Sequence, residues 1–388
     1  MSFLRRFLKP STPRADGAAA WGRVPASPHR SAPYAHGLDA VEPDVDGEGG
    51  GVAEASASPA APGGGARAAA APTIELPQAN ASGRRREPTR DTREIWAVGG
   101  GKGGIGKSLI TSNLGISLAR AGRRVVLVDA DLGGANLHTC LGIPEPKVTL
   151  TDFVSRRVRG IEDILIRTGV PNLSLISGAH DFLSAANLNF VQKTMLLRRI
   201  AELDADVVIL DLGAGTTYNT LDFFLLAQKG IVVAVPEPTS IENCYRFIKS
   251  AFYRRLRRVV ANAQVKRLIE SAMDQKNALG IRTPNDLLTR IMQMDTQIGE
   301  VIQRQIGEFR PKIIMNQART RADVEIGEHM RTACRKYFGI EVEYLGAIDY
   351  DDVVWQSVRR REPLLLRHPG SVSARSVERI AARLLQGA

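Results

Sequence analysis

A glycine-rich loop directly after a short apolar run constrains this chain more than any other feature. Gly99 to Ser108 reads GGGKGGIGKS and follows the apolar residues Ile95 to Val98. Residues 101–108 fit G-x-x-x-x-G-K-[ST], in which glycines let successive backbone N–H groups surround phosphate oxygens. The flanking residues predict a strand before the loop and a helix after it, with the positive end of the helix facing the anion. The sequence therefore predicts a phosphate-binding loop in an α/β fold.

The residue types of the loop predict separate roles. Lys107 would reach the β- and γ-phosphates, and the hydroxyl of Ser108 would bind Mg²⁺. A glycine-rich turn without a phosphate role is the alternative, but a turn of that kind requires neither the lysine nor the serine. We expect the nucleotide to contact the whole loop, namely Gly101, Lys102, Gly103, Gly104, Ile105, Gly106, Lys107 and Ser108.

Two more apolar runs end in carboxylates. Residues 125–128 precede Asp129 and Asp131, and residues 207–210 precede Asp211. In a parallel α/β sheet, ligands bind at the carboxyl ends of the strands, so we expect these side chains near the phosphate loop. Four apolar residues followed by Asp is the Walker B pattern, which places a carboxylate on the water shell of a metal ion. A buried strand ending in an Asp-Gly turn is the alternative for the second run.

Several motifs together resemble one family. The segment KGGIGKS, with the early Lys102, resembles the deviant Walker A motif of the MinD/ParA class of P-loop ATPases. Residues 236–249, PEPTSIENCYRFIK, resemble the corresponding segment of its FlhG/FleN branch, the MinD-like flagellar site-determining ATPases. The stretch LGAIDYDDVVWQSVRRREPLLL follows the MinD pattern. The resemblance covers residues 94–249 and 311–385.

This resemblance implies an ATP-binding, slowly hydrolysing, Mg²⁺-dependent ATPase. ATP would hold two copies together as a homodimer, and a protein partner would stimulate hydrolysis. The biological class it implies is a spatial regulator that positions flagella, division sites or another cargo, in the cytoplasm, on the inner face of the cell membrane or at a pole. A ParA-like partitioning ATPase, which binds DNA nonspecifically through phosphates, is the alternative.

The resemblance also implies individual roles. Lys102 would reach the nucleotide of the partner subunit, as an arginine finger would, although a solvated lysine is the alternative. Asp131 would orient the attacking water. The implied catalytic residues are Lys102, Lys107 and Asp131, the metal-binding residues are Ser108, Asp129 and Asp211, and Asn316 would recognise the adenine edge.

The remaining sequence suggests an N-terminal arm followed by one domain with an insertion. Residues 1–92 are rich in Ala, Gly and Pro and are expected to form a disordered arm, because they contain few residues that build a core. Residues 93–388 predict one doubly wound, mostly parallel α/β domain with a helical insertion at about 250–310. Three well-separated cysteines indicate a reducing compartment and no iron–sulfur cluster. The net charge of +11 is compatible with anionic partners such as DNA or lipid.

The insertion predicts two helices. Residues 246–267 contain eight basic residues and no acidic one, around an apolar stripe at helical spacing. We expect Arg254, Arg257 and Arg258 to form a cluster that faces solvent. Thr283 and Pro284 suit a helix start, and a second helix would carry a short coiled-coil-like seam: Leu287, Ile291, Met294, Ile298 and Val301.

The first ten residues, MSFLRRFLKP, have the composition of a short interfacial anchor. On a helix, Phe3, Leu4, Phe7 and Leu8 would share one face, with basic residues opposite. Two copies in a dimer would bind a membrane more strongly than one. A disordered start, or a short helix that docks on a protein partner, are the alternatives.

Overall fold

The computed structural model describes residues 93–131, 134–178, 190–273 and 279–387. The fold presented here is that of the second of two units in the chain, residues 82–388. The segment MSFLRRFLKP and the arm predicted over residues 1–92 lie outside the described residues.

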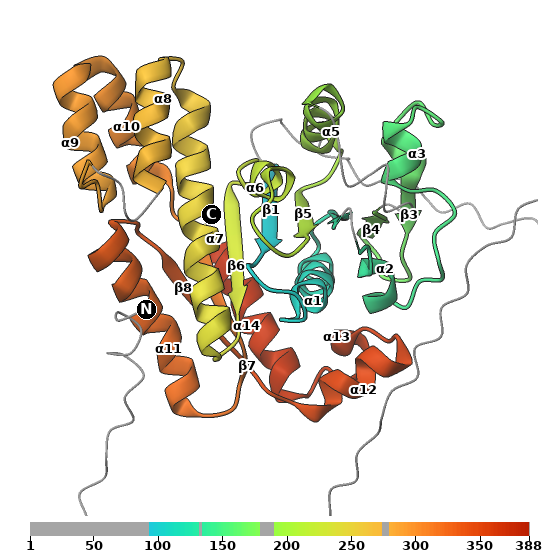
Figure 1. The fold of residues 1–388 in the computed structure, drawn as a ribbon. Coiled ribbons are helices and arrows are strands. Elements are labelled where there is room, and N and C mark those ends of the chain that lie inside the picture. Colours follow the sequence, from blue (N-terminus) through green and yellow to red (C-terminus); the bar gives the residue numbers. More distant parts are fainter. Residues whose placement is uncertain (1–92, 132–133, 179–189, 274–278, 388) are drawn as a thin grey trace, which may run out of the picture. The chain divides into compact units, whose positions relative to one another are not determined.

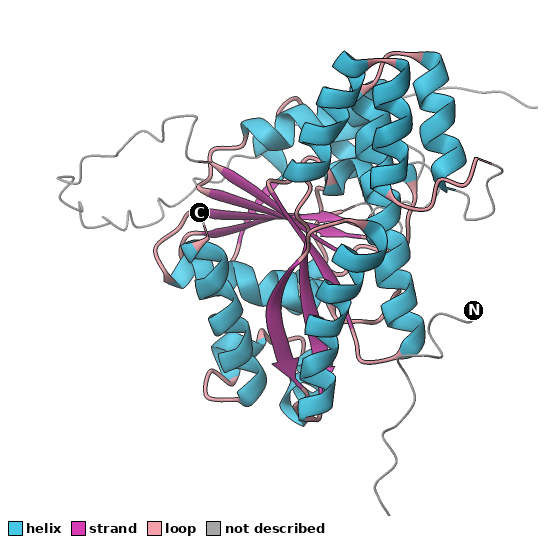
Figure 2. Ribbon diagram, turned by 90° about the vertical axis from the view of Figure 1, so that its left-hand side faces the viewer, coloured by secondary structure: helices cyan, strands magenta, loops and turns pink. Residues whose placement is uncertain are grey.

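A sheet of eight strands organises the described part of the chain (Figure 2). The strand order is β3-β4-β2-β5-β1-β6-β7-β8. Adjacent strands run parallel, except that β3 is antiparallel to β4. The predicted doubly wound, mostly parallel fold is confirmed. The strands are β1 Glu94–Gly99, β2 Val125–Ala130, β3 Leu165–Arg167, β4 Leu173–Ile176, β5 Val207–Leu212, β6 Lys229–Ala234, β7 Lys312–Ala318 and β8 Glu343–Asp349.

Helices cover both faces of the sheet (Figure 1). One face packs against α1, α13 and α14, and the other against α5, α6, α7 and α11. The helices are α1 Lys107–Arg120, α2 Leu137–Cys140, α3 Leu150–Val154, α5 Phe190–Glu202, α6 Tyr218–Phe224, α7 Pro238–Val259, α8 Ala263–Met273, α9 Pro284–Met294, α10 Thr296–Glu308, α11 Arg321–Ala333, α12 Asp352–Arg360, α13 Leu364–Arg367 and α14 Val372–Gln386. A 3₁₀ turn, Glu162–Ile164, and a π turn, Cys334–Phe338, complete the list.

The central strands are buried on both faces, as their continuous apolar runs predict. Every residue of β2 and β5 is buried, including the carboxylates Asp129 and Asp211. The helix after the glycine loop is buried on several sides, because Ile110, Leu114 and Ile116 are each 1% exposed or less. It ends at Arg120, and Gly122 follows with a φ of 83°, the left-handed conformation that favours glycine.

The helical insertion is confirmed, but its division into two helices is wrong. The segment expected to form the first helix is divided into α7 and α8. The division occurs because Asn262 accepts hydrogen bonds from the backbone N–H groups of Gln264 and Val265 and so starts a new helix. The second is α9 and α10, since Asp295 caps α10 through the N–H of Ile298 at 3.0 Å. The expected seam therefore does not persist: Met294 is 51% exposed and Val301 is 39% exposed.

The predicted solvent-facing arginine cluster on α7 does not form, because Arg258 is exposed as predicted but Arg254 and Arg257 turn to carboxylates of neighbouring helices. Arg254 donates to both carboxylate oxygens of Asp222 on α6, each at 2.9 Å, and Asp222 also accepts from Lys193 on α5. Arg257 pairs with Glu270 on α8 at 2.7 Å. Helical spacing alone placed these side chains opposite the apolar stripe, but the neighbouring helices supply carboxylates on that side.

Candidate nucleotide-binding site

The loop between β1 and α1 is packed tightly on one side and open on another. A Cβ at Gly101 would lie 2.3 Å from the carbonyl oxygen of Asn243, so only glycine fits there. Gly103 and Gly104 have no atom within 4 Å of the position that a Cβ would take. Gly104 and Gly106 have φ values of 73° and 89°, which glycine adopts without strain. The backbone is thus held close to α7 and is open where an anion would approach.

Lys107 lies at the start of α1 and is only 8% exposed. Its Nζ donates to the carbonyl oxygen of Lys102, at 3.5 Å. Burial lowers the pKa of Lys107, while the nearby carboxylates of Asp211 and Asp131 act to raise it. A buried ammonium with one long hydrogen bond is a favourable partner for a phosphate oxygen.

Asp129 and Asp211 lie side by side in the sheet, because they are register partners in the β2–β5 pair. Asp129 is fully buried and accepts from the N–H of Leu137 at 2.9 Å. Its pKa is raised well above the ordinary value by burial and then by repulsion from Asp211. Burial likewise raises the pKa of Asp211 to about 6, against hydrogen bonds from Ser108 and Thr111 and the charge of Lys107.

This chemistry fits a magnesium ion held jointly by protein and phosphates. A cation near Asp211 would relieve the repulsion between two buried carboxylates. In the part of the chain that the structure describes, no group of three His, Cys, Asp or Glu side chains is positioned to hold a metal alone. Mg²⁺ typically uses one or two carboxylates together with substrate phosphates, so Ser108 and Asp211 would suffice beside a nucleotide.

Asp131 lies between the carboxyl end of β2 and the turn after β5. A Cβ at Gly213 would lie 2.8 Å from Oδ1 of Asp131, so this carboxylate closely approaches the backbone that follows Asp211. The N–H of Gly215 donates to the carbonyl oxygen of Gly100 at 3.1 Å. The structure thus brings the phosphate loop, Asp131 and the turn after β5 to one place, as the sequence predicts.

Lys102 forms an ion pair within its own chain. Its Nζ lies 2.8 Å from Oε2 of Glu237, which precedes α7, and the two side chains are 41% and 56% exposed. Pairs this exposed contribute little to stability, so the lysine can exchange partners at small cost. Its role toward a second subunit stays a prediction.

Asn316 lies within β7 rather than at its end, because the strand continues to Ala318. Its Nδ2 donates to the carbonyl oxygen of Ile105 at 2.8 Å and supports the phosphate loop from beside Gly106. It also lines a cavity of about 310 Å³ whose other walls include Asp349, Tyr350 and Trp355. That position suits contact with a base, which stays a prediction.

Two residues that contribute to the site were not predicted from the sequence. Thr111 donates to Oδ1 of Asp211 at 3.1 Å, and its place one helical turn after Lys107 is the signal that would have found it. Glu237 lies 135 residues from Lys102, and nothing local predicts that pair.

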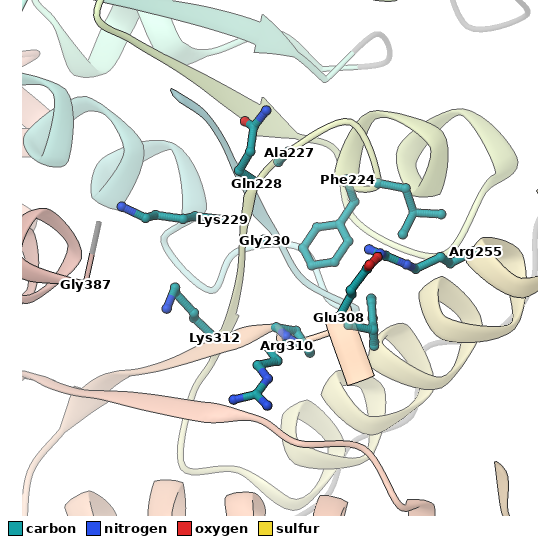
Figure 3. Close-up of a pocket in the computed structure, with 13 residues that line it drawn as sticks. Phe224, Ala227, Gln228, Lys229, Gly230, Arg255, Glu308, Arg310, Lys312 and Gly387 are labelled. Atoms are coloured by element: carbon teal, nitrogen blue, oxygen red, sulfur yellow. The ribbon is translucent and has the colours of Figure 1, made fainter. Parts of the chain in front are cut away.

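A second cavity, of about 180 Å³, lies at the amino-terminal ends of the strands, where β6 and β7 begin (Figure 3). Three of its four cations have carboxylate partners: Lys229 pairs with Glu94 at 2.8 Å, Arg255 with Glu308 at 2.8 Å, and Lys312 with Glu343, while Arg310 donates to the carbonyl oxygen of Gly307. Figure 3 shows Arg255 and Glu308 facing each other. This cavity is not part of the nucleotide site.

The loop, the buried Lys107 and the carboxylates of β2 and β5 define a P-loop nucleotide-binding protein of the α/β class. The family model ParA, described as NUBPL iron-transfer P-loop NTPase, matches residues 91–264. A chain assigned as the septum site-determining protein MinD of Oltmannsiellopsis viridis is 31% identical over 297 residues, 76% of each chain. The protein belongs to the MinD/ParA family of P-loop ATPases.

Other relatives cover less or share only the fold. The antiactivator FleN of Pseudomonas aeruginosa is 37% identical over 158 residues, so the match spans 40% of this chain and 55% of FleN. The solved septum site-determining protein MinD of Pyrococcus horikoshii, complexed with Mg-ADP, superimposes with a TM-score of 0.52 at 20% identity, over 76% of this chain and 98% of that one. No helix among the described residues is both long and apolar enough to cross a membrane.

Proposed function

We propose that this protein is an ATPase whose ATP-bound homodimer acts as a spatial regulator. The observation that carries the proposal is that one open phosphate loop contains two lysines, Lys107, which is buried, and Lys102, whose side chain is 41% exposed. Lys107 is placed for the chain's own phosphates, and Lys102 is held by an exposed ion pair with Glu237 that it can exchange at small cost. The septum site-determining name of MinD and the resemblance of residues 236–249 to the FlhG/FleN branch support a regulator in the class that places division sites or flagella.

The residues of the chain divide the chemistry between them. Lys107 and the loop N–H groups would bind the phosphates, Ser108 and Asp211 would hold Mg²⁺, and Asp129 would support it from beside Asp211. When bound, Mg²⁺ would neutralise charge on the phosphate oxygens. Asp131 orients the attacking water from its position against the turn after β5.

Lys102 supplies the link between nucleotide and dimer. In the isolated chain it is held by Glu237. In the dimer it leaves Glu237 and donates to the phosphates of the partner subunit, where negative charge develops during transfer. ATP thus joins the two subunits, and hydrolysis by Asp131-oriented water ends the dimer.

Phosphate release by the full chain tests the enzymatic part. Lys107→Ala should reduce ATP hydrolysis at least a hundredfold, because the phosphates lose their buried cation. Lys147→Ala removes a lysine that is exposed on a surface loop and should leave the rate unchanged. Equal rates for wild type and Lys107→Ala would contradict the proposed site.

Fluorescence of the tagged protein in cells tests the biological part. Accumulation at a pole or division site, lost in Lys107→Ala, is the expected result. Spread over the nucleoid, together with salt-sensitive DNA binding that requires ATP, would support the ParA-like alternative instead.

A further inference from the structure

One edge of the sheet has no neighbouring strand within the described residues. β8 is the last strand in the sheet order, so it pairs with β7 along a single side. Such an edge presents backbone N–H and C=O groups that can pair with another chain. One of them has a side-chain partner, since Nη1 of Arg383 donates to the carbonyl oxygen of Leu345 at 2.6 Å.

Two cavities follow this edge along the length of the strand. The larger, about 390 Å³, is lined by β8 residues from Tyr344 to Asp349 and by α11 and α14. The smaller, about 250 Å³, continues past Glu343 to Glu341. The two share Glu328 and Tyr344, so they form one slot along β8, which we call the β8 slot. A slot that follows a strand edge has the shape of an extended segment.

The walls of the larger cavity carry opposite charges. The α11 wall contributes Glu325 and Glu328, and the α14 wall contributes Arg379 and Arg383. These helices pack on opposite faces of the sheet, because their buried side chains belong to separate core clusters. Successive side chains of a strand also point to opposite faces. A segment in the larger cavity would therefore present alternate residues to an acidic wall and to a basic wall, whereas the smaller cavity also has Arg331 on its α11 side.

The existing partners of these side chains are easily exchanged. Arg379 lies 3.7 Å from Asp349, with the two side chains 63% and 46% exposed. Glu325 and Glu328 pair with arginines of their own helix, again as exposed pairs. Pairs this exposed contribute little to stability, and a peptide carbonyl or carboxylate could replace Leu345 as the acceptor for Arg383.

We propose that the β8 slot binds an extended segment of a protein partner as an additional strand. The segment has alternating charge: basic residues face Glu325 and Glu328 on α11, and acidic residues face Arg379 and Arg383 on α14. Strand pairing with β8 provides the backbone contacts, and the two walls provide the selectivity. The residues that line the slot lie outside the phosphate loop, but Asp349 also lines the cavity beside Asn316.

Fluorescence anisotropy with the full chain tests the proposal. The first peptide has eight residues that alternate Lys and Glu. The second has the same composition with four Lys followed by four Glu, so each of its faces carries both charges. The third is the alternating peptide with every backbone nitrogen methylated, which cannot donate to a strand. The alternating peptide should bind at least tenfold more tightly than either of the others.

Charge reversal locates the binding. Arg379→Glu combined with Arg383→Glu should weaken binding of the alternating peptide at least tenfold, because both walls of the larger cavity are then acidic. Arg267→Glu combined with Arg304→Glu makes the same change in charge at exposed positions on α8 and α10 and should leave binding unchanged. Equal affinity for the alternating and block peptides would overturn the alternating pattern. Undiminished binding of the methylated peptide would overturn strand pairing. Both peptide comparisons use the wild-type chain, so neither depends on whether a variant folds.

Discussion

Replacing Asp211 by asparagine should stabilise the nucleotide-free protein at neutral pH while removing a ligand of Mg²⁺. Burial raises the pKa of Asp211 to about 6, against an ordinary value of 3.8. At about 1.4 kcal/mol per pKa unit, the ionised side chain costs the folded state about 3 kcal/mol. The asparagine oxygen can still accept the hydrogen bond of Thr111. Asp211→Asn should therefore gain about 2–3 kcal/mol of unfolding free energy at pH 7.5.

The sign of the effect depends on pH in a defined way. The folded state binds this proton more tightly than the unfolded chain, so the cost of ionisation is absent below pH 3.8 and complete above pH 6. Urea unfolding of wild type and Asp211→Asn should show a gain at pH 5 that is about half of that at pH 7.5. No gain at pH 7.5, or the same gain at both pH values, would refute the reasoning.

Asp206 provides a matched control with the opposite sign. Although partial burial acts to raise its pKa, hydrogen bonds from the backbone and side chain of Arg124 hold that pKa below the ordinary value. Asp206→Asn should destabilise the protein at pH 7.5, and this loss should shrink as the pH falls and the native carboxylate becomes protonated. MgATP should stabilise wild type and Asp206→Asn, but it should stabilise Asp211→Asn much less.

The other predictions concern single contacts. Gly101→Ala should destabilise the nucleotide-free protein by about 1–3 kcal/mol in urea, because its Cβ meets backbone at 2.3 Å, while Gly103→Ala should not. Glu237→Gln should let ATP dimerise the protein at several-fold lower concentration in light scattering, since Lys102 is released; an unchanged midpoint would contradict this. Asp222→Ala should cost about 3 kcal/mol of unfolding free energy, because it leaves two cations unpaired.

The sheet and the phosphate loop could be predicted because their determinants are local. The GGGKGGIGKS loop allows few conformations, and parallel strands that carry Asp129 and Asp211 near their carboxyl ends bring these side chains together. The insertion was predicted less well because Asn262 and Asp295 act as helix caps inside segments whose apolar spacing continues. Periodicity shows which residues are buried, but it does not show where one helix stops and another starts.

Contacts between distant residues were beyond local reasoning. Helical spacing placed Arg254 on a solvated face, yet α6 presents Asp222 there. Lys102 was singled out by its early position in the loop, but its partner Glu237 is the residue just before α7. Both pairs depend on how helices pack across the sheet, which a single sequence does not specify.

The central claim is that ATP joins two copies through Lys102 and that hydrolysis by water oriented by Asp131 dissociates the dimer. Light scattering with and without MgATP tests this claim most directly. Wild type should change from monomer to dimer on addition of MgATP. Asp131→Ala should stay dimeric at saturating MgATP, because water is no longer oriented for attack. Lys102→Ala should stay monomeric while it still binds nucleotide, because Lys107 and the loop are intact. A monomer mass for Asp131→Ala at saturating MgATP would contradict the account.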